Sequence, residues 1–299
     1  MENTKTAFVS IVGRPNVGKS TLINAILGEK IAIVSKKPQT TRNTITGILT
    51  EGDTQYVFID TPGVHKPRTA LGKNMVKNAM RSMADMDVII FVTEPAQGIN
   101  AAEEKLIASF GTSGIPVILA VNKIDSKKPH EIAEAIKAYS ERFDFASVLP
   151  ISALTGDNVP LLMEEVSKYA REDMWLFPDD IATSQPERQI AAEIVREKLL
   201  RLLDDEIPHG TAVVIEQFED SGKLLRIAAN IYCEKEGHKR IIIGNKGEMI
   251  KRIGSYARED MEEFFGGKVY LDLWVKVKEK WRDSEAEINR FGYKLDDRD

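Results

Sequence analysis

The sequence predicts two domains: an α/β domain with a mostly parallel sheet, then a smaller α+β domain. Short apolar runs typical of buried strands alternate with helical runs up to about residue 171, the pattern of a parallel sheet with helices on both faces. The alternation breaks at 174–186, which contains two prolines. The order after the break is helix, strand, strand, helix, helix, strand. We therefore place the domains at 1–175 and 188–299, with a linker at 176–187.

The composition is that of an ordinary globular protein. The chain has 299 residues, of which 42% are hydrophobic and 29% charged, and its formal net charge is −5. This balance excludes a general basic attraction to nucleic acid, so any such site must be a local patch. The single cysteine, Cys233, excludes an intramolecular disulfide and fits a reducing compartment. No signal peptide and no membrane-spanning apolar run is apparent, so we expect a cytoplasmic protein, with peripheral contact at the cytoplasmic face of the membrane left open.

A glycine-containing loop follows the first predicted strand, at 7–12, and precedes a helical run at 21–27. It reads Gly13-Arg14-Pro15-Asn16-Val17-Gly18-Lys19-Ser20 and fits the phosphate-binding pattern G-x-x-x-x-G-K-[ST]. Loop N–H groups and the helix N-terminus present positive partial charge to a polyanion. In this pattern Lys19 reaches the β- and γ-phosphates and the Ser20 hydroxyl binds Mg²⁺. A plain glycine turn would not require all four fixed positions.

A polar segment at 35–42 lies between two strand-like runs, the first of them at 30–34. It reads either as a solvated loop or as a switch loop in which a threonine hydroxyl senses Mg²⁺ and the γ-phosphate. The spacing alone leaves both readings open.

The next predicted strand, at 55–60, ends in a carboxylate and continues as Asp60-Thr61-Pro62-Gly63-Val64. Ligands bind at the carboxyl ends of strands in parallel sheets. Asp60 is therefore placed to hold Mg²⁺ through water, and the Gly63 N–H is placed to meet a γ-phosphate.

Further strands are predicted at 87–92, 116–121 and 148–151. The second is followed by Asn122-Lys123-Ile124-Asp125 and the third by Ser152-Ala153. A carboxylate at Asp125 can accept from both the N1–H and the 2-amino group of guanine, and adenine has neither donor. The backbone at Ser152 and Ala153 is placed to touch the guanine oxygen.

Together these motifs resemble the translation-factor-like GTPases, and most closely the Era family of the TrmE–Era group. Residues 13–20 match its phosphate loop, Asp60–Gly63 its second switch, and 122–125 with 151–153 its base-recognition motifs. Its first switch is matched by Gln39, Thr40, Thr41, Arg42 and Asn43. By this resemblance Thr41 is the Mg²⁺-sensing threonine, with Thr40 left open. The metal ligands are then Ser20, Thr41 and, through water, Asp60.

Val64 occupies the position where Ras-type proteins carry the glutamine that orients the attacking water. A valine has no polar group with which to hold water. The resemblance implies that something else does so, since this group often uses K⁺ bound through an asparagine of the phosphate loop, here Asn16. A simple turn role for Asn16 is the alternative. The implied catalytic residues are Lys19, Thr41, Gly63 and Asn16.

The element order of the second half resembles a KH domain of the bacterial type (type II), and Gly244-Asn245-Lys246-Gly247 matches its GXXG loop. That loop clamps about four nucleotides of single-stranded RNA. Residues 235–252 hold six Lys or Arg against two Glu, a local basic patch in an acidic chain. The RNA-binding residues are Ile243, Gly244, Asn245, Lys246, Gly247, Lys251 and Arg252. Lys276, Lys278, Lys280 and Trp281 are candidates to extend the surface.

The resemblance covers nearly the whole chain and implies a monomeric GTPase that uses Mg²⁺, binds GTP and GDP, and has no DNA partner. It also implies binding to small-subunit ribosomal RNA near its 3′ end and a role in assembly of the small ribosomal subunit. One alternative is a phosphate-loop kinase or ATPase, which the motif at 122–125 argues against. Another is a passive RNA-binding module with a vestigial nucleotide site, which the intact Lys19, Ser20 and Asp60 argue against.

Overall fold

The computed structural model describes residues 4–35, 37, 40–63, 69–81, 83, 85–96 and 98–293. Gln39 and Val64, two of the residues predicted above to act in the switches, lie outside this part. The chain divides into two compact units. The first comprises Met1–Ala32, Thr41–Pro67 and Gly72–Ser184, and the second Ile33–Thr40, Arg68–Leu71 and Gln185–Asp299.

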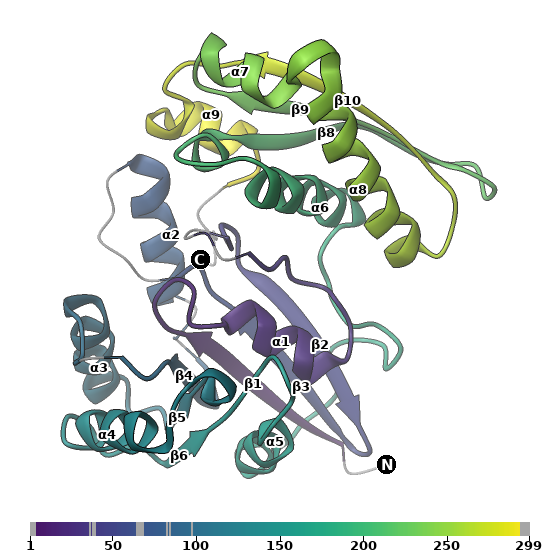
Figure 1. Ribbon diagram of the computed structural model, residues 1–299. Coiled ribbons are helices and arrows are strands. Elements are labelled where there is room, and N and C mark those ends of the chain that lie inside the picture. Colours follow the sequence, from purple (N-terminus) through teal and green to yellow (C-terminus); the bar gives the residue numbers. More distant parts are fainter. Residues whose placement is uncertain are drawn as a thin grey trace. The chain divides into compact units, whose positions relative to one another are not determined.

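The first unit is built on one sheet in the order β2-β3-β1-β4-β5-β6, with the short β7 paired to β1 (Figure 1). All pairs along this order are parallel except β2 with β3, and β7 is antiparallel to β1. The mostly parallel sheet predicted from the sequence is thus confirmed. Its strands are β1 Lys5–Val12, β2 Ile45–Glu51, β3 Thr54–Asp60, β4 Val88–Thr93, β5 Val117–Val121, β6 Ser147–Pro150 and β7 Arg171–Glu172.

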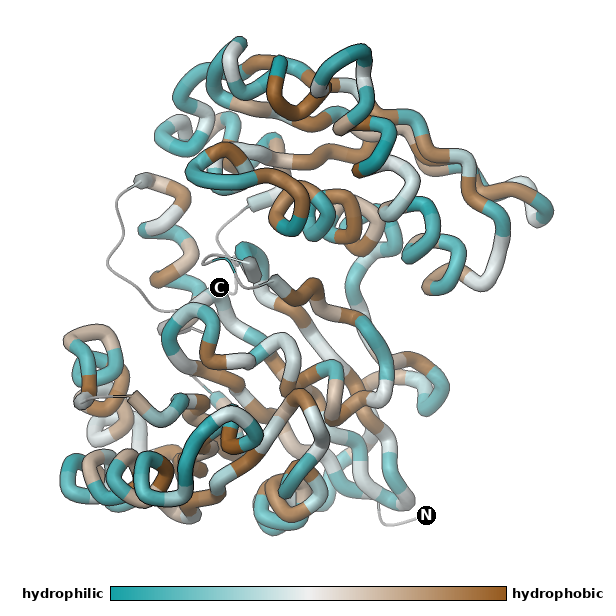
Figure 2. Tube along the Cα trace, in the orientation of Figure 1, coloured by the Kyte–Doolittle hydropathy of each residue, from teal (hydrophilic) through white to brown (hydrophobic). Residues whose placement is uncertain are grey.

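Helices cover both faces of this sheet because its strands are apolar on both faces. Alternate residues of β4 show this: Ile90 and Val92 pack in the cluster of α1 and α5, while Ile89 and Phe91 pack in that of α2, α3 and α4. Figure 2 shows the resulting hydrophobic colour along the central strands. The helices are α1 Lys19–Leu27, α2 Ala70–Arg81 (in this unit from Gly72), α3 Ala101–Ser113, α4 Pro129–Ser140, α5 Val159–Ser167 and the 3₁₀ turn η1 Ile124–Ser126.

The strand-like run predicted at 30–34 is wrong, because this stretch is a buried loop. The side chain of Asn24 in α1 replaces a strand partner: its Nδ2 donates to Ala32 O at 2.8 Å, and Ala32 N donates to its Oδ1 at 2.9 Å. Ile31, Ala32 and Ile33 are therefore buried without joining the sheet.

The second unit has a three-stranded sheet in the order β10-β9-β8, with β9 parallel to β10 and antiparallel to β8. Residues of α6, α7 and α8 share one apolar core with this sheet. The predicted order of helices and strands is confirmed. The elements are α6 Glu187–Leu202, η2 Pro208–Gly210, β8 Ala212–Asp220, β9 Leu225–Cys233, α7 Glu236–Ile243, η3 Asn245–Gly247, α8 Glu248–Phe265, β10 Val269–Val277, η4 Trp281–Asp283 and α9 Glu285–Arg290.

The segment at 281–291 packs on this unit through aromatic side chains. Phe291, which follows α9, stacks on Tyr232 of β9 with ring centroids 4.4 Å apart. Trp281 is fully buried and its Nε1 donates to Gly210 O at 2.9 Å. The suggestion that Trp281 extends an RNA surface is therefore wrong, because its ring belongs to the core. Among the described helices, none combines the length and the apolar character needed to cross a membrane.

Candidate nucleotide and RNA sites

The phosphate-binding loop connects β1 to α1. Gly18 has φ +101°, and a Cβ there would lie 2.2 Å from Asn122 Nδ2, so this position requires glycine. Helix α1 begins at the next residue, Lys19. The unpaired N–H groups of its first turn therefore face the loop, as an anion site requires.

Lys19 is buried inside this loop. Its Nζ donates to the carbonyl oxygens of Gly13 and Arg14, at 3.2 and 3.1 Å. Burial lowers the pKa of Lys19 to about 8, and the nearby Asp60 carboxylate opposes that shift. A bound polyphosphate would add negative charge beside the ammonium and favour its protonated form.

Three oxygen-bearing side chains meet at the start of α1. Ser20 Oγ donates to Asp60 Oδ2 at 2.9 Å and lies 2.8 Å from Thr41 Oγ1. Asp60 is fully buried, and its Oδ1 has no hydrogen-bond partner within the described residues. Burial raises the pKa of Asp60 to about 6, against the opposing effect of Lys19. A buried carboxylate oxygen without a donor, beside two hydroxyls, fits a hard cation such as Mg²⁺.

The two neighbouring threonines of the first switch have different surroundings. The Thr41 hydroxyl joins Ser20, whereas the Thr40 hydroxyl donates to Lys37 O at 2.7 Å within its own loop. Thr40 belongs to the second unit, where its carbonyl oxygen accepts a hydrogen bond from Arg196 of α6. Arg42 is buried and Asn43 is half-buried. This geometry favours Thr41 over Thr40 as the metal-sensing residue.

The described residues of the second switch lie against the phosphate loop. Thr61 Oγ1 donates to Ile11 O at 3.0 Å, and Pro62 is buried. Gly63 lies directly against Pro15. The D-x-x-G segment is therefore next to the loop that it was predicted to serve.

The base-recognition motif is joined to the phosphate loop by hydrogen bonds. Asn122 is buried; its Nδ2 donates to Val17 O at 2.7 Å, and its Oδ1 accepts from Ala153 N at 2.9 Å. Asp125 is exposed in η1, and Ser152 Oγ donates to its Oδ1 at 2.6 Å. Within the part of the chain that the structure describes, no residue donates a hydrogen bond to the other carboxylate oxygen of Asp125. The loops at 13–20, 122–125 and 152–153 thus form one site.

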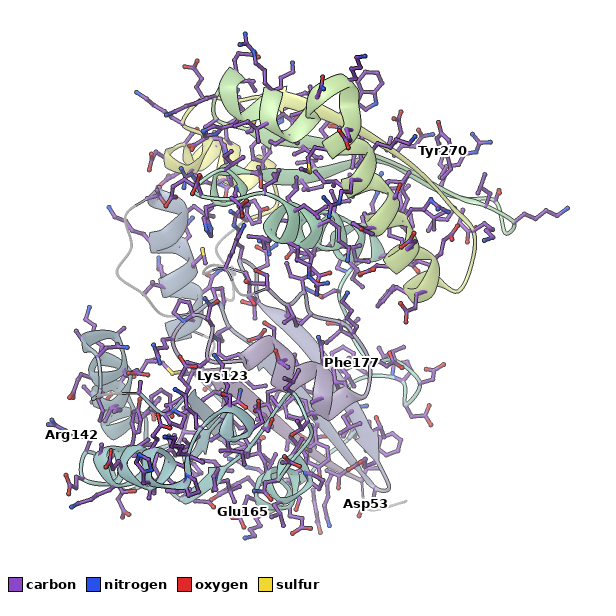
Figure 3. The ribbon with its side chains drawn as sticks, viewed as in Figure 1. Asp53, Lys123, Arg142, Glu165, Phe177 and Tyr270 are labelled. Atoms are coloured by element: carbon purple, nitrogen blue, oxygen red, sulfur yellow. The ribbon has the colours of Figure 1, made fainter. Side chains whose placement is uncertain are left out.

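Glu94 belongs to this site, and the motif search missed it. It directly follows β4, and its carboxylate contacts Arg14 at 2.7 Å and Lys123 at 2.5 Å. Lys123, labelled in Figure 3, also donates from Nζ to Asn16 O at 2.6 Å. The available signal was its place at the carboxyl end of a buried parallel strand, the same rule that selected Asp60.

The GXXG loop of the second unit joins α7 to α8. Gly244 has φ +76°, and a Cβ there would lie 2.7 Å from Met249 N. Asn245 and Lys246 are exposed, with Lys246 in a left-handed conformation at φ +50°. Gly247 precedes the first residue of α8, and Ile243 is half-buried. The loop therefore presents polar side chains at a helix N-terminus, where backbone N–H groups favour phosphate.

Two cations on the first turns of α8 continue this surface. Lys251 and Arg252 are exposed, and the Arg252 guanidinium lies 5.8 Å from the ring centroid of Tyr256. Tyr256 is 43% exposed. A cation beside an exposed ring suits contact with phosphates and unpaired bases.

Comparisons with known proteins give results for both units. Residues 8–123 match the family described as 50S ribosome-binding GTPase, and residues 206–282 match the KH domain. The GTPase Era of Clostridium kluyveri is 51% identical over 291 residues, covering 97% of this chain and 99% of that protein. The GTPase Era of Clostridium botulinum strain Hall is 50% identical, covering 97% and 98%.

Solved structures agree over nearly the whole chain. A variant of Aquifex aeolicus Era bound to GDP·AlF₄⁻ is 38% identical with a TM-score of 0.93, covering 98% of this chain and all of that one. A structure of Era with MgGDPNP and nucleotides 1506–1542 of 16S ribosomal RNA is 39% identical with the same TM-score and the same coverage.

Proposed function

The chain belongs to the Era family of GTPases, and from this premise we propose that it couples its guanine-nucleotide state to binding of small-subunit ribosomal RNA. The Era relative solved with an RNA fragment and MgGDPNP supports this proposal. The role proposed for this chain is assembly of the small ribosomal subunit, as a cytoplasmic monomer. Peripheral contact at the cytoplasmic face of the membrane stays an open question of the sequence.

The observation that carries the nucleotide half of the proposal is the joining of three loops into one site. Asn122 connects them through its bonds to Val17 and Ala153. In this arrangement Lys19 compensates phosphate charge and Asp125 reads the guanine edge. The proposed GTP-binding set is 13–20, 60–64, 122–125, 152 and 153.

The residues around Asp60 fit a magnesium ion. We propose that Ser20 and Thr41 hold it through their hydroxyls, with Asp60 acting through water. When bound, Mg²⁺ neutralises charge on the phosphate oxygens. Asp60 keeps Ser20 oriented, while Gly63 and Lys19 donate hydrogen bonds toward the terminal phosphate. We also propose that the side chain of Asn16 holds K⁺, a cation that would stand in for the water-orienting glutamine of Ras-type proteins.

The RNA half rests on the exposed loop at 244–247 together with Ile243, Lys251 and Arg252. We propose that backbone N–H groups and Lys246 contact the phosphates of a single RNA strand. We also propose that the first domain ends at residue 175 and that the RNA-binding domain begins at residue 188. The proposal is tested by titrating the purified full chain with GDP, GTP and ATP, and then with RNA of the 16S 3′ end. Micromolar or tighter guanine-nucleotide binding, weak ATP binding and RNA binding support it. Preference for ATP, or no RNA binding, refutes it.

A further inference from the structure

Glu94 lies between two loops that the proposed function assigns to nucleotide binding. Its Oε1 is 2.7 Å from the Arg14 guanidinium, and its Oε2 is 2.5 Å from Lys123 Nζ. The Glu94 side chain is 21% exposed. One carboxylate thus joins the phosphate loop to the base-recognition motif with both oxygens.

Each of the two cations that Glu94 contacts also interacts with a second partner. Lys123 Nζ also donates to the main-chain carbonyl of Asn16, and its own backbone is left-handed at φ +68°. Arg14 Nε lies 3.1 Å from Glu103 Oε1, and Glu103 is 1% exposed. Glu103 is fixed in turn, because it forms the capping box of α3 with Asn100. The first half of the phosphate loop is therefore attached to β4, β5 and α3 through this chain of charges.

The charges in this cluster balance, with Arg14 and Lys123 facing Glu94 and Glu103. Removing one carboxylate from a partly buried cluster leaves an excess cation, which costs more than the loss of an exposed surface pair. Among the described residues, Glu94 contacts Arg14 and Lys123, and no contact joins it to the Ser20, Thr41 and Asp60 group. Loss of Glu94 should therefore loosen the nucleotide pocket without a direct effect on that group.

We infer that Glu94 is a positioning residue for guanine nucleotide, acting through Lys123 and Arg14. This inference rests on the proposed function. Glu94 holds the phosphate loop and the base-recognition motif at a fixed separation, and so sets how long the nucleotide stays bound.

The test compares the full-length wild type with Glu94→Gln, which keeps the shape of the side chain and removes its charge. In Glu94→Gln we expect the rate constant for release of fluorescent GDP and the KM for GTP each to rise about tenfold, the equivalent of 1.4 kcal/mol. We expect kcat to stay within about twofold. Glu94→Asp keeps a carboxylate, so its rate of GDP release and its KM should lie between those of the wild type and Glu94→Gln.

Glu104→Gln is the matched control. Glu104 lies on α3, and its carboxylate is 3.6 Å from Arg142, so this variant changes the net charge by the same amount away from the loop. We expect wild-type GDP release from it.

Three results would overturn the inference: unchanged GDP release in Glu94→Gln, a fall in kcat with KM unchanged, or equal effects in both variants. A lower thermal midpoint of the nucleotide-free Glu94→Gln protein together with unchanged GDP release would show a structural role alone. A wild-type protein that fails to bind GDP would instead refute the proposed function itself.

Discussion

Replacing Asp125 by Asn should change which base the protein accepts. Thr155 N donates to Ser152 Oγ at 3.2 Å, and Ser152 Oγ donates to Asp125 Oδ1 at 2.6 Å. Ser152 thus has its hydrogen directed at residue 125. An asparagine there keeps its carbonyl oxygen toward Ser152 and turns its NH₂ to the position of Oδ2. That group donates, so it opposes the N1–H and 2-amino donors of guanine and suits the 2-oxo group of xanthine.

The size of this effect follows from two hydrogen bonds to a charged carboxylate. Each is worth about 1.5–3 kcal/mol, so losing both costs about 3–6 kcal/mol. At 1.4 kcal/mol per factor of ten, GDP affinity should fall by roughly 10²- to 10⁴-fold. Xanthosine diphosphate should become the better ligand. Competition against fluorescent GDP and against a fluorescent xanthine nucleotide measures both affinities.

Asp157→Asn provides the control for this prediction. Asp157 lies in the exposed loop that holds Ser152 and Thr155, and it accepts from Thr155 Oγ1 at 2.7 Å, away from Asp125. This variant should bind GDP as the wild type does. Unchanged GDP affinity in Asp125→Asn, with no gain for the xanthine nucleotide, would remove Asp125 from the base pocket. Equal losses in the two variants would indicate general damage to the loop.

Four further predictions follow from the same sites. GTP turnover should be faster in K⁺ than in Na⁺, and Asn16→Ala should erase the difference; equal rates in the two salts for the wild type would exclude the potassium role. The double variant Gly244→Asp and Gly247→Asp should lose RNA binding and keep GDP binding, because two carboxylates would face the phosphates; normal RNA binding would place the RNA elsewhere. Since burial raises the pKa of Asp60 to about 6, protons compete with the metal for this carboxylate, so apparent Mg²⁺ affinity should fall as the pH drops below about 6; no loss of Mg²⁺ affinity down to pH 5 would contradict this. A non-hydrolysable GTP analogue should raise RNA affinity about 5–150-fold over GDP, and RNA should raise affinity for the analogue by the same factor; identical RNA affinities in both states would show independent sites.

The sequence by itself determined the motif-bearing loops, the element order of the second unit and the family resemblance. The glycines at 18 and 244 could be read directly, because each occupies a fixed position of a short motif. Asp60 could be placed because the carboxyl ends of parallel strands meet at one edge of a sheet. These constraints act over a few residues, or through a spacing rule that holds for any parallel sheet.

Only the tertiary structure decided the remaining features. The choice between Thr40 and Thr41 depended on which hydroxyl reaches Ser20, and the burial of Trp281 depended on packing by the chain that follows it. The sequence showed only that Glu94 follows a predicted strand and not what it contacts, because its partners Arg14 and Lys123 are 80 and 29 positions away. Contacts between residues far apart in the chain leave no periodicity along the sequence. They exist because folding brings separate strand ends together, and only three-dimensional coordinates show which side chains then meet.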